Sequence, residues 1–336
     1  MREVRIGVIG LGRIGELHAK NLAFRVPRAK LVAVVDVDKG KLNKVVSELG
    51  VGGFEDYRDL LKGDIVDAVV IATPSYMHVK MVEEFAEASK HIFCEKPLAL
   101  NLEGAKRCVK AVEKAGVKLQ VGYMRRFDPG YSKAKKIVER GEIGRPVLIK
   151  LISRDPAPPP GWVADPKLSG GIFIDLASHD FDLARWLMRG EVRRVYVEGG
   201  ALVYEEVRKY GDLDNAVINL LFEDGRIGNV DVSRNAVYGY DIRTEILGTE
   251  GAVVVGKWRE TPLVLFKKGG FSCDTVWWFR ERFAQAYLNE MITFVDCLLR
   301  DKDCPVTGYD GLKAVEIAMA CKKSLEEGRP VTLPLD

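Results

Sequence analysis

A glycine-rich segment near the start of the chain constrains the fold more than any other feature. The residues Gly10-Leu11-Gly12-Arg13-Ile14-Gly15 stand between an apolar run, residues 4–9, and a stretch of helical character, residues 15–24. In such a strand-to-helix turn, one glycine permits the tight turn, a second lets the backbone approach a pyrophosphate, and a third lets helix and strand pack closely. The N–H groups at the helix N-terminus then hold the phosphates. We therefore predict a dinucleotide site that includes Gly10, Gly12, Arg13, Ile14 and Gly15.

An acidic residue stands where a dinucleotide-binding domain is expected to contact ribose. Asp36 closes the apolar run of residues 31–35, and such domains carry an acid about 20 residues after the glycines. Its carboxylate would accept hydrogen bonds from the ribose hydroxyls and repel a 2′-phosphate, and Asp38 would add to this repulsion. NAD is therefore favoured over NADP. The alternative role of Asp36 is to cap a helix that begins near Lys39.

Strand-like and helix-like segments alternate through the first third of the chain. Candidate strands are residues 4–9, 31–35, 66–72, 91–94 and 118–121, and candidate helices are residues 41–49, 78–88 and 102–115. This alternation predicts an α/β Rossmann domain with an open parallel sheet. Ligands on such sheets bind beyond the carboxyl ends of the strands. We place this domain over residues 1–122.

The pattern changes to period-two strands from residue 147 onward. Candidate strands are residues 215–222, 226–233, 243–247, 252–255 and 263–267, followed by helices over residues 284–299 and 308–327. Together with the turn Asp224-Gly225, this predicts an α+β domain with a large, mostly antiparallel open sheet over residues 123–336. A half-exposed apolar face of that kind is commonly covered by a partner subunit, so we expect a homo-oligomer.

Composition narrows the class of protein. The chain has 336 residues, which exceeds what one ordinary core organises. Its 51 basic and 48 acidic residues give a net charge of +3, and no basic run indicates a nucleic-acid partner. No apolar run is long enough for a membrane span and no signal-peptide pattern is present, so we expect a cytoplasmic protein. The six cysteines lack zinc spacing, which predicts reduced thiols, no disulfide and no metal.

Two places in the sequence offer groups for chemistry, and the first is Lys96. It follows the apolar run of residues 91–94 and precedes Pro97, which disfavours a helical conformation for Lys96. An ammonium at the end of a strand would point into the crevice of the sheet. The alternative is a surface lysine neutralised by its neighbour Glu95.

The second place is the segment of residues 170–187. Read as one helix, it places Asp175, His179 and Asp182 on one side, at spacings of four and three. Carboxylates beside an imidazole raise its pKa and fix its orientation, which suits His179 to acid–base chemistry. Two alternatives remain: a metal site made from Asp175 and His179, which lacks an obvious third ligand, and a structural histidine.

Five separated motifs together resemble the glucose-fructose oxidoreductase and inositol dehydrogenase family of NAD(P)-dependent oxidoreductases. They are the glycine segment and residues 72–74, 95–97, 122–128 and 175–179. Residues 124–128 and 238–242 are most similar to the inositol 2-dehydrogenase branch. The likeness extends along nearly the entire chain and is loosest over residues 153–167 and 198–214, which would line the substrate side.

The resemblance implies NAD-dependent oxidation of a secondary hydroxyl on a cyclic polyol or sugar, in a tetramer or dimer. The family's catalytic set matches Lys96, Asp175 and His179, with His179 as the base, Asp175 orienting it and Lys96 contacting the reacting oxygen. Positions that border the cofactor match Thr73, Pro74, His78, Glu95 and Lys96. Substrate-facing positions match Lys96, Arg126, Asp175, His179 and Tyr240.

Two of the substrate-facing residues have alternative structural roles, and the protein has alternative functions. Tyr240 could be a packing residue on a strand, and Arg126 could pair with Asp128. The same groups would also serve a reductase of a keto-sugar or other carbonyl. A regulator that senses the dinucleotide without turnover is a further alternative, although it would not need all three chemical groups.

Overall fold

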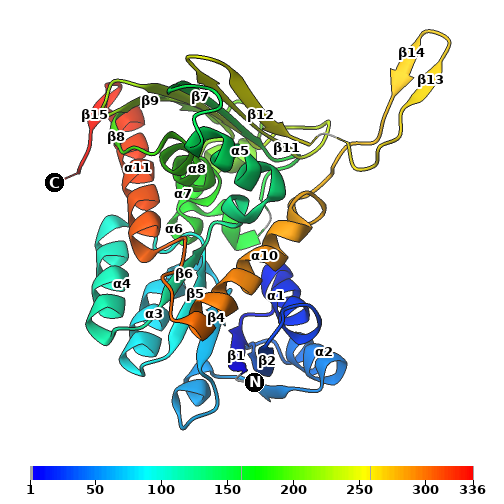
Figure 1. Cartoon of the computed structure of the whole chain (residues 1–336), viewed down its shortest axis with the longest axis vertical. Helices are drawn as coiled ribbons and strands as arrows, with labels where there is room; N and C mark the ends of the chain where they lie inside the picture. Colours follow the sequence, from blue (N-terminus) through cyan, green and yellow to red (C-terminus); the bar gives the residue numbers. More distant parts are fainter. Residues whose placement is uncertain (1–2, 160, 258, 336) are drawn as a thin grey trace. The chain divides into compact units, whose positions relative to one another are not determined.

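The computed structural model describes residues 3–159, 161–257 and 259–335 and forms two compact units (Figure 1). The first unit comprises residues 1–124 and 286–315, and the second comprises residues 125–285 and 316–336. Our expected division into residues 1–122 and 123–336 assigned residues 286–315 to the second domain, whereas the structure groups them with the first.

The first unit is built on a six-stranded parallel sheet with strand order β3-β2-β1-β4-β5-β6. The strands are β1 (Val4–Ile9), β2 (Ala29–Val35), β3 (Gly52–Phe54), β4 (Ala68–Ile71), β5 (His91–Glu95) and β6 (Leu119–Gly122). The predicted parallel sheet is confirmed. Only β3 was not predicted, because it has three residues and begins with two glycines, so no apolar run marks it.

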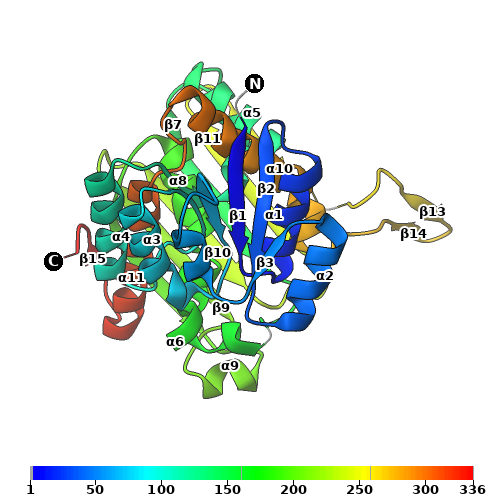
Figure 2. The same ribbon diagram turned by 90° about the horizontal axis from the view of Figure 1, so that it is seen from below.

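Four helices connect these strands. They are α1 (Arg13–Phe24), α2 (Lys39–Leu49), α3 (His78–Glu87) and α4 (Leu102–Ala115). In Figure 2, α1 and α2 lie on one side of β1, and α3 and α4 lie on the other. Residues such as Ile6 of β1, Leu22 of α1 and Phe294 of α10 (Phe279–Arg300) share one hydrophobic core. This burial explains why residues 286–315 belong to the first unit.

The second unit contains a seven-stranded sheet in the order β12-β11-β7-β10-β9-β8-β15. The strands are β7 (Pro146–Arg154), β8 (Val192–Gly200), β9 (Asn215–Phe222), β10 (Ile227–Ser233), β11 (Asp241–Gly248), β12 (Ala252–Gly256) and β15 (Val331–Thr332). All pairings are antiparallel except that of β7 with β10, as expected for a mostly antiparallel sheet. The expected strand over residues 263–267 is instead part of a separate hairpin, β13 (Leu265–Lys267) and β14 (Gly270–Ser272), which extends away from the sheet (Figure 1).

One face of the large sheet is buried and the other is open. Along β9, Ala216, Ile218 and Leu220 are buried, while Val217 is 45 % exposed. The buried face packs against α5 (Pro129–Glu139) and α8 (Ser178–Met188). The other α-helices described in this unit are α6 (Pro166–Ser169), α7 (Gly171–Asp175), α9 (Glu205–Lys209), the start of α10 and part of α11 (Gly308–Glu327).

Two further expectations concern cysteines and membranes. The six cysteines are free thiols, and Cys273 is the exposed one among these described residues. Among the helices of the described residues, none is both long and apolar enough to cross a membrane.

Candidate active site

The glycine loop between β1 and α1 has the backbone geometry of a dinucleotide site. Gly10 has a φ of +89°, and a Cβ added there would lie 2.7 Å from the carbonyl oxygen of Ala72. A Cβ on Gly15 would lie 1.7 Å from the carbonyl oxygen of Gly10, whereas a Cβ on Gly12 would meet nothing within 4 Å. Gly10 and Gly15 are thus required by close packing, and Gly12 leaves open space beside the backbone. This is the division of roles that pyrophosphate binding needs.

The N-terminus of α1 completes this loop as an anion site. Its N-cap is Gly12, which has no side chain that could accept a hydrogen bond from the first N–H groups. These donors and the positive end of the helix dipole favour a phosphate. In addition, β1 and β4 are neighbours at the point where the strand order reverses, which is where open α/β sheets bind ligands.

Asp36, at the end of β2, is held against the glycine loop. Its Oδ2 accepts a hydrogen bond from the N–H of Leu11 at 2.6 Å, and its Oδ1 accepts one from the N–H of Asp38 at 2.8 Å. Asp38 is the cap of α2, accepting from the N–H groups of Gly40 and Lys41. The alternative capping role of Asp36 is therefore wrong. A carboxylate oxygen has two lone pairs, so Asp36 retains acceptors for ribose hydroxyls.

His78 joins the loops that follow β4 and β5. Its ring is buried, with Nδ1 2.7 Å from the carbonyl oxygen of Pro97 and Nε2 2.9 Å from that of Thr73. Burial lowers the pKa of His78. Both ring nitrogens already have protein partners. His78 thus supports the loops that carry Thr73, Pro74 and Lys96, and its ring does not reach outward.

Glu95 is the last residue of β5, and Lys96 follows it directly. Glu95 Oε1 lies 2.7 Å from Nε2 of His18 on α1, and its Oε2 accepts the backbone N–H of Lys96 at 3.3 Å. Lys96 itself is half-buried. These contacts direct the Glu95 carboxylate into the protein, next to His18.

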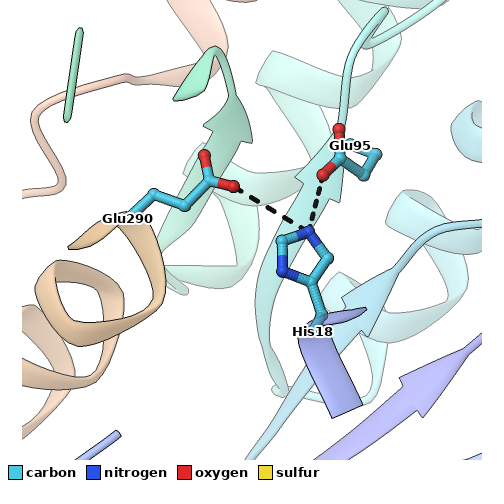
Figure 3. A group of neighbouring side chains, drawn as sticks. All are labelled: His18, Glu95 and Glu290. Atoms are coloured by element: carbon cyan, nitrogen blue, oxygen red, sulfur yellow. Dashed lines mark hydrogen bonds and ion pairs between the residues drawn. The ribbon is translucent and has the colours of Figure 1, made fainter. Parts of the chain in front are cut away.

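Sequence reasoning missed the group of residues around His18. Figure 3 shows His18, Glu95 and Glu290 of α10 turned toward one another. Among the described residues, this is the group of His, Cys, Asp and Glu side chains close enough to hold a metal ion, and it does not include Asp175 or His179. The available signals were His18 and Glu290, titratable residues whose positions place them on the buried faces of α1 and α10.

In the second unit, the segment of residues 170–187 is not the single helix that we expected. α7 ends at Asp175 and α8 begins at Ser178. The N–H groups of Leu176 and Ala177 both donate to the carbonyl oxygen of Ile172, at 3.1 and 2.9 Å, so the helical register slips by one residue. The spacing argument that placed Asp175 on one helical face with His179 and Asp182 is therefore wrong.

Asp175 has a buried cationic partner. Its Oδ2 accepts a hydrogen bond from Nη2 of Arg234 at 3.2 Å, and Arg234 is fully buried. The same Nη2 lies 3.9 Å from Oδ2 of Asp212, whose Oδ1 accepts the N–H of Ile172 at the start of α7. Burial raises the pKa of Asp212. Arg234 therefore links Asp175 to the segment that follows β10, a contact that no local pattern predicted.

Arg126 is paired with Asp182, not with Asp128. The contact is bidentate and buried, with Nε 2.8 Å from Oδ2 and Nη2 2.5 Å from Oδ1 of Asp182. Asp128 caps α5 through the N–H groups of Gly130 and Tyr131, and it pairs with Arg282 at 2.8 Å. The alternative pairing that we considered for Arg126 is thus wrong. Asp182, which the sequence placed on the same helical side as His179, is thus the partner of Arg126.

Tyr240 lies in a buried polar and aromatic environment. Its ring centroid is 6.3 Å from those of Trp278 and Phe283, and burial raises the pKa of its hydroxyl, which the nearby Arg125 guanidinium opposes. Arg125 is itself buried and bonds Asp180 through Nη1 at 2.8 Å. The packing role considered for Tyr240 therefore has direct support, and its hydroxyl is neutral at physiological pH.

Comparisons with known proteins agree with this architecture. A family model for the oxidoreductase family with an NAD-binding Rossmann fold matches residues 4–123, and the GFO/IDH/MocA C-terminal domain model matches residues 131–254. The chain therefore belongs to the GFO/IDH/MocA family of NAD-binding oxidoreductases, as the motifs predicted.

Relatives of nearly the same length are similar along the whole chain. The myo-inositol 2-dehydrogenase of Thermotoga maritima is 43 % identical over 98 % of this chain and 98 % of its own. The scyllo-inositol 2-dehydrogenase (NAD(+)) of Bacillus subtilis is 42 % identical over 98 % of this chain and 96 % of its own. A crystal structure of scyllo-inositol dehydrogenase from Lactobacillus casei with NAD(H) and scyllo-inositol has a TM-score of 0.92 at 35 % identity, covering 98 % of this chain and 99 % of that one.

Proposed function

We propose that this oxidoreductase transfers a hydride from a secondary hydroxyl of an inositol to NAD, as an inositol 2-dehydrogenase. The observation that carries the proposal is its identity of 42–43 % over nearly the full length to two inositol 2-dehydrogenases. The geometry of the glycine loop fits a dinucleotide, since Gly12 leaves room where a pyrophosphate would lie. The fit extends to Asp36, which has free acceptor capacity for the ribose hydroxyls of NAD.

Three residues would perform the chemistry. NAD, when bound, accepts the hydride. His179 takes the proton of the reacting hydroxyl, and a well-placed base contributes about 10²–10⁴ in rate. Asp175, paired with Arg234, stabilises the imidazolium that forms. Lys96 donates a hydrogen bond to the reacting oxygen and offsets its developing negative charge.

The remaining site residues would bind and orient. Arg126, whose guanidinium is fixed by its contacts with Asp182, would orient a substrate hydroxyl. Tyr240 would form a hydrogen bond to the inositol substrate through its neutral hydroxyl. On the cofactor side we assign the positions predicted from the sequence, which are Gly10, Gly12, Arg13, Ile14, Gly15, Asp36, Thr73, Pro74, Glu95 and Lys96, with His78 in a supporting role.

The open face of the large sheet would pack against other copies of the chain and become buried there. Exposed apolar side chains on it include Val217, Ile227 and Val254, and the hairpin β13–β14 exposes Phe266 and Phe271. Exposed apolar surface of this extent marks interaction sites. We therefore propose a homo-tetramer acting in the cytoplasm. Light scattering coupled to size-exclusion chromatography tests the assembly, and a monomer at micromolar concentration would contradict it.

A single assay tests the function. NADH absorbance is followed with myo-, scyllo- and D-chiro-inositol and a set of aldoses, each with NAD and with NADP. We expect turnover with at least one inositol and NAD. Turnover only in the reverse direction with a keto-sugar would indicate a carbonyl reductase. Tight NADH binding without any turnover would indicate a sensor of the dinucleotide.

A further inference from the structure

Three titratable side chains from three distant parts of the chain meet in the interior of the first unit. His18 comes from α1, Glu95 from the end of β5 and Glu290 from α10 (Figure 3). His18 and Glu290 are 0 % exposed and Glu95 is 9 % exposed. Nε2 of His18 lies 2.7 Å from Oε1 of Glu95 and 3.8 Å from Oε1 of Glu290. One imidazole nitrogen therefore faces two carboxyl groups.

The carboxyl group of Glu290 has no hydrogen-bond partner, at either oxygen, among the residues that the structure describes. The nearby amide of Gln120 on β6 donates to the backbone carbonyl oxygen of Glu290, at 3.0 Å, and not to its side chain. An ionised carboxylate buried in this way would carry a large desolvation cost. Burial, with the negative charge of Glu95 as a further cause, raises the pKa of Glu290 well above its usual range. A neutral carboxylic acid removes that cost.

The geometry favours a proton over a metal ion as the means of neutralising Glu290. Zinc binds nitrogen and oxygen ligands at about 2.0–2.2 Å, so tetrahedral ligands would stand about 3.3 Å apart. The separation of 2.7 Å between His18 Nε2 and Glu95 Oε1 is shorter and is that of a hydrogen bond. The Nδ1 atom of His18 is buried, with no hydrogen-bond partner in the described part of the chain, which assigns the proton to Nε2, as donor to Glu95.

The pair of His18 and Glu95 leads directly to Lys96. The second oxygen of Glu95 accepts the backbone N–H of Lys96 at 3.3 Å. A Cβ on Gly122 would lie 2.8 Å from the same oxygen, so the carboxylate is packed tightly in place. An ionised Glu290 would compete with Glu95 for the single Nε2–H of His18. A neutral Glu290 leaves that donor to Glu95.

We propose that Glu290 is kept as a neutral carboxylic acid, and that it thereby leaves His18, a positioning residue, to hold Glu95 and, through it, the backbone of Lys96. The inference rests on the proposed function for the role of Lys96 in turnover. Within the described ranges, the titratable groups that face Glu290 are His18 from α1 and Glu95 from β5, while β6 contributes the amide of Gln120. Neither His18 nor Glu290 touches substrate in this scheme.

The first test replaces Glu290 by its neutral isostere. Because a neutral acid and an amide carry the same charge, Glu290→Gln should keep kcat within twofold of the wild type. A carboxyl whose pKa is raised on folding contributes stability that is present below its unfolded pKa of about 4.3 and is lost as pH rises toward the folded pKa. The thermal midpoint of Glu290→Gln, measured with saturating NAD, should therefore rise relative to wild type as pH increases from 5 to 9.

The second test separates positioning from general damage to the fold. His18→Ala should lower kcat at least tenfold with the Kd for NADH, from its fluorescence, within threefold of wild type. His18→Gln, whose amide can donate to Glu95, should recover part of kcat. Asn21→Ala is the matched control, since Asn21 is buried one turn further along α1 and should leave kcat unchanged.

Three outcomes would overturn the proposal. One is a loss of activity in Glu290→Gln as large as that in His18→Ala. Another is a thermal midpoint whose difference from wild type does not change with pH. The third is one divalent metal ion per chain that survives dialysis of the wild type and is absent from Glu290→Gln by mass spectrometry. If Lys96→Ala retains turnover, the proposed function fails for Lys96, while the midpoint comparison still decides the state of Glu290.

Discussion

The two units build their parts of the candidate site in different ways. In the first, the glycines that shape the loop lie within six residues, and the loop geometry follows from their spacing. In the second, Arg126 and Asp182 are 56 residues apart, and Asp175 and Arg234 are 59 residues apart. A binding site formed by the backbone of one turn can thus be predicted from the sequence. An ion pair between distant segments becomes apparent only in the folded structure.

Substitution of one proposed chemical group from each unit should have the largest effect. We expect Lys96→Ala and His179→Ala each to reduce kcat by about 10²–10⁴, since each removes hydrogen bonding or proton transfer at the reacting hydroxyl. Binding of NADH, followed by fluorescence, should stay within a few-fold of wild type. If either variant retains full turnover, the substituted residue does not take part in the reaction, and the catalytic role proposed for it is wrong.

A pair of glycine variants sharpens the description of the first unit. Gly15→Ala places a methyl group 1.7 Å from a backbone oxygen, so we expect a loss of about 3 kcal/mol in the free energy of unfolding. Gly12→Ala meets nothing within 4 Å and should leave stability unchanged while weakening NAD binding. Denaturant unfolding and calorimetric NAD titration measure the two effects. Equal stability losses in both variants would contradict the assigned roles.

Arg234 tests the long-range pairing of the second unit. Arg234→Gln removes the buried positive charge that pairs with Asp175, so we expect kcat to fall about tenfold. Arg185→Gln is the matched control, because Arg185 is also buried and pairs with an acid, Glu191. An unchanged kcat in Arg234→Gln would separate Arg234 from the chemistry of Asp175.

The smallest effects are expected at the two acids that follow β2. Asp36→Ala should change the ratio of kcat/KM for NAD to that for NADP about tenfold in favour of NADP, because it removes a ribose acceptor and a charge that repels a 2′-phosphate. Asp38→Ala removes the cap of α2 and should cost about 1 kcal/mol of stability. If Asp38→Ala shifts the cofactor ratio as much as Asp36→Ala does, the division between the two acids is wrong.

Much of the first unit was predictable because its signals are local. Parallel strands buried on both faces appear as apolar runs, and the helices between them have clear ends, as at Gly50 and Gly116 in the left-handed region. In the second unit, residues 263–267 form an apolar run like that of a sheet strand but lie in the exposed hairpin β13–β14. The break after Asp175 contains no glycine or proline that would have predicted it.

The sequence by itself determined the strand–glycine–helix turn, the parallel sheet and the positions at which chemistry could occur. Only the tertiary structure decided that Asp175 faces Arg234, that Arg126 faces Asp182, and that His18 and Glu290 meet at Glu95. The physical reason is the distance along the sequence over which each feature is determined. A turn depends on the backbone freedom of a few adjacent residues, whereas the partner of a buried charge is chosen by the packing that excludes water from around it.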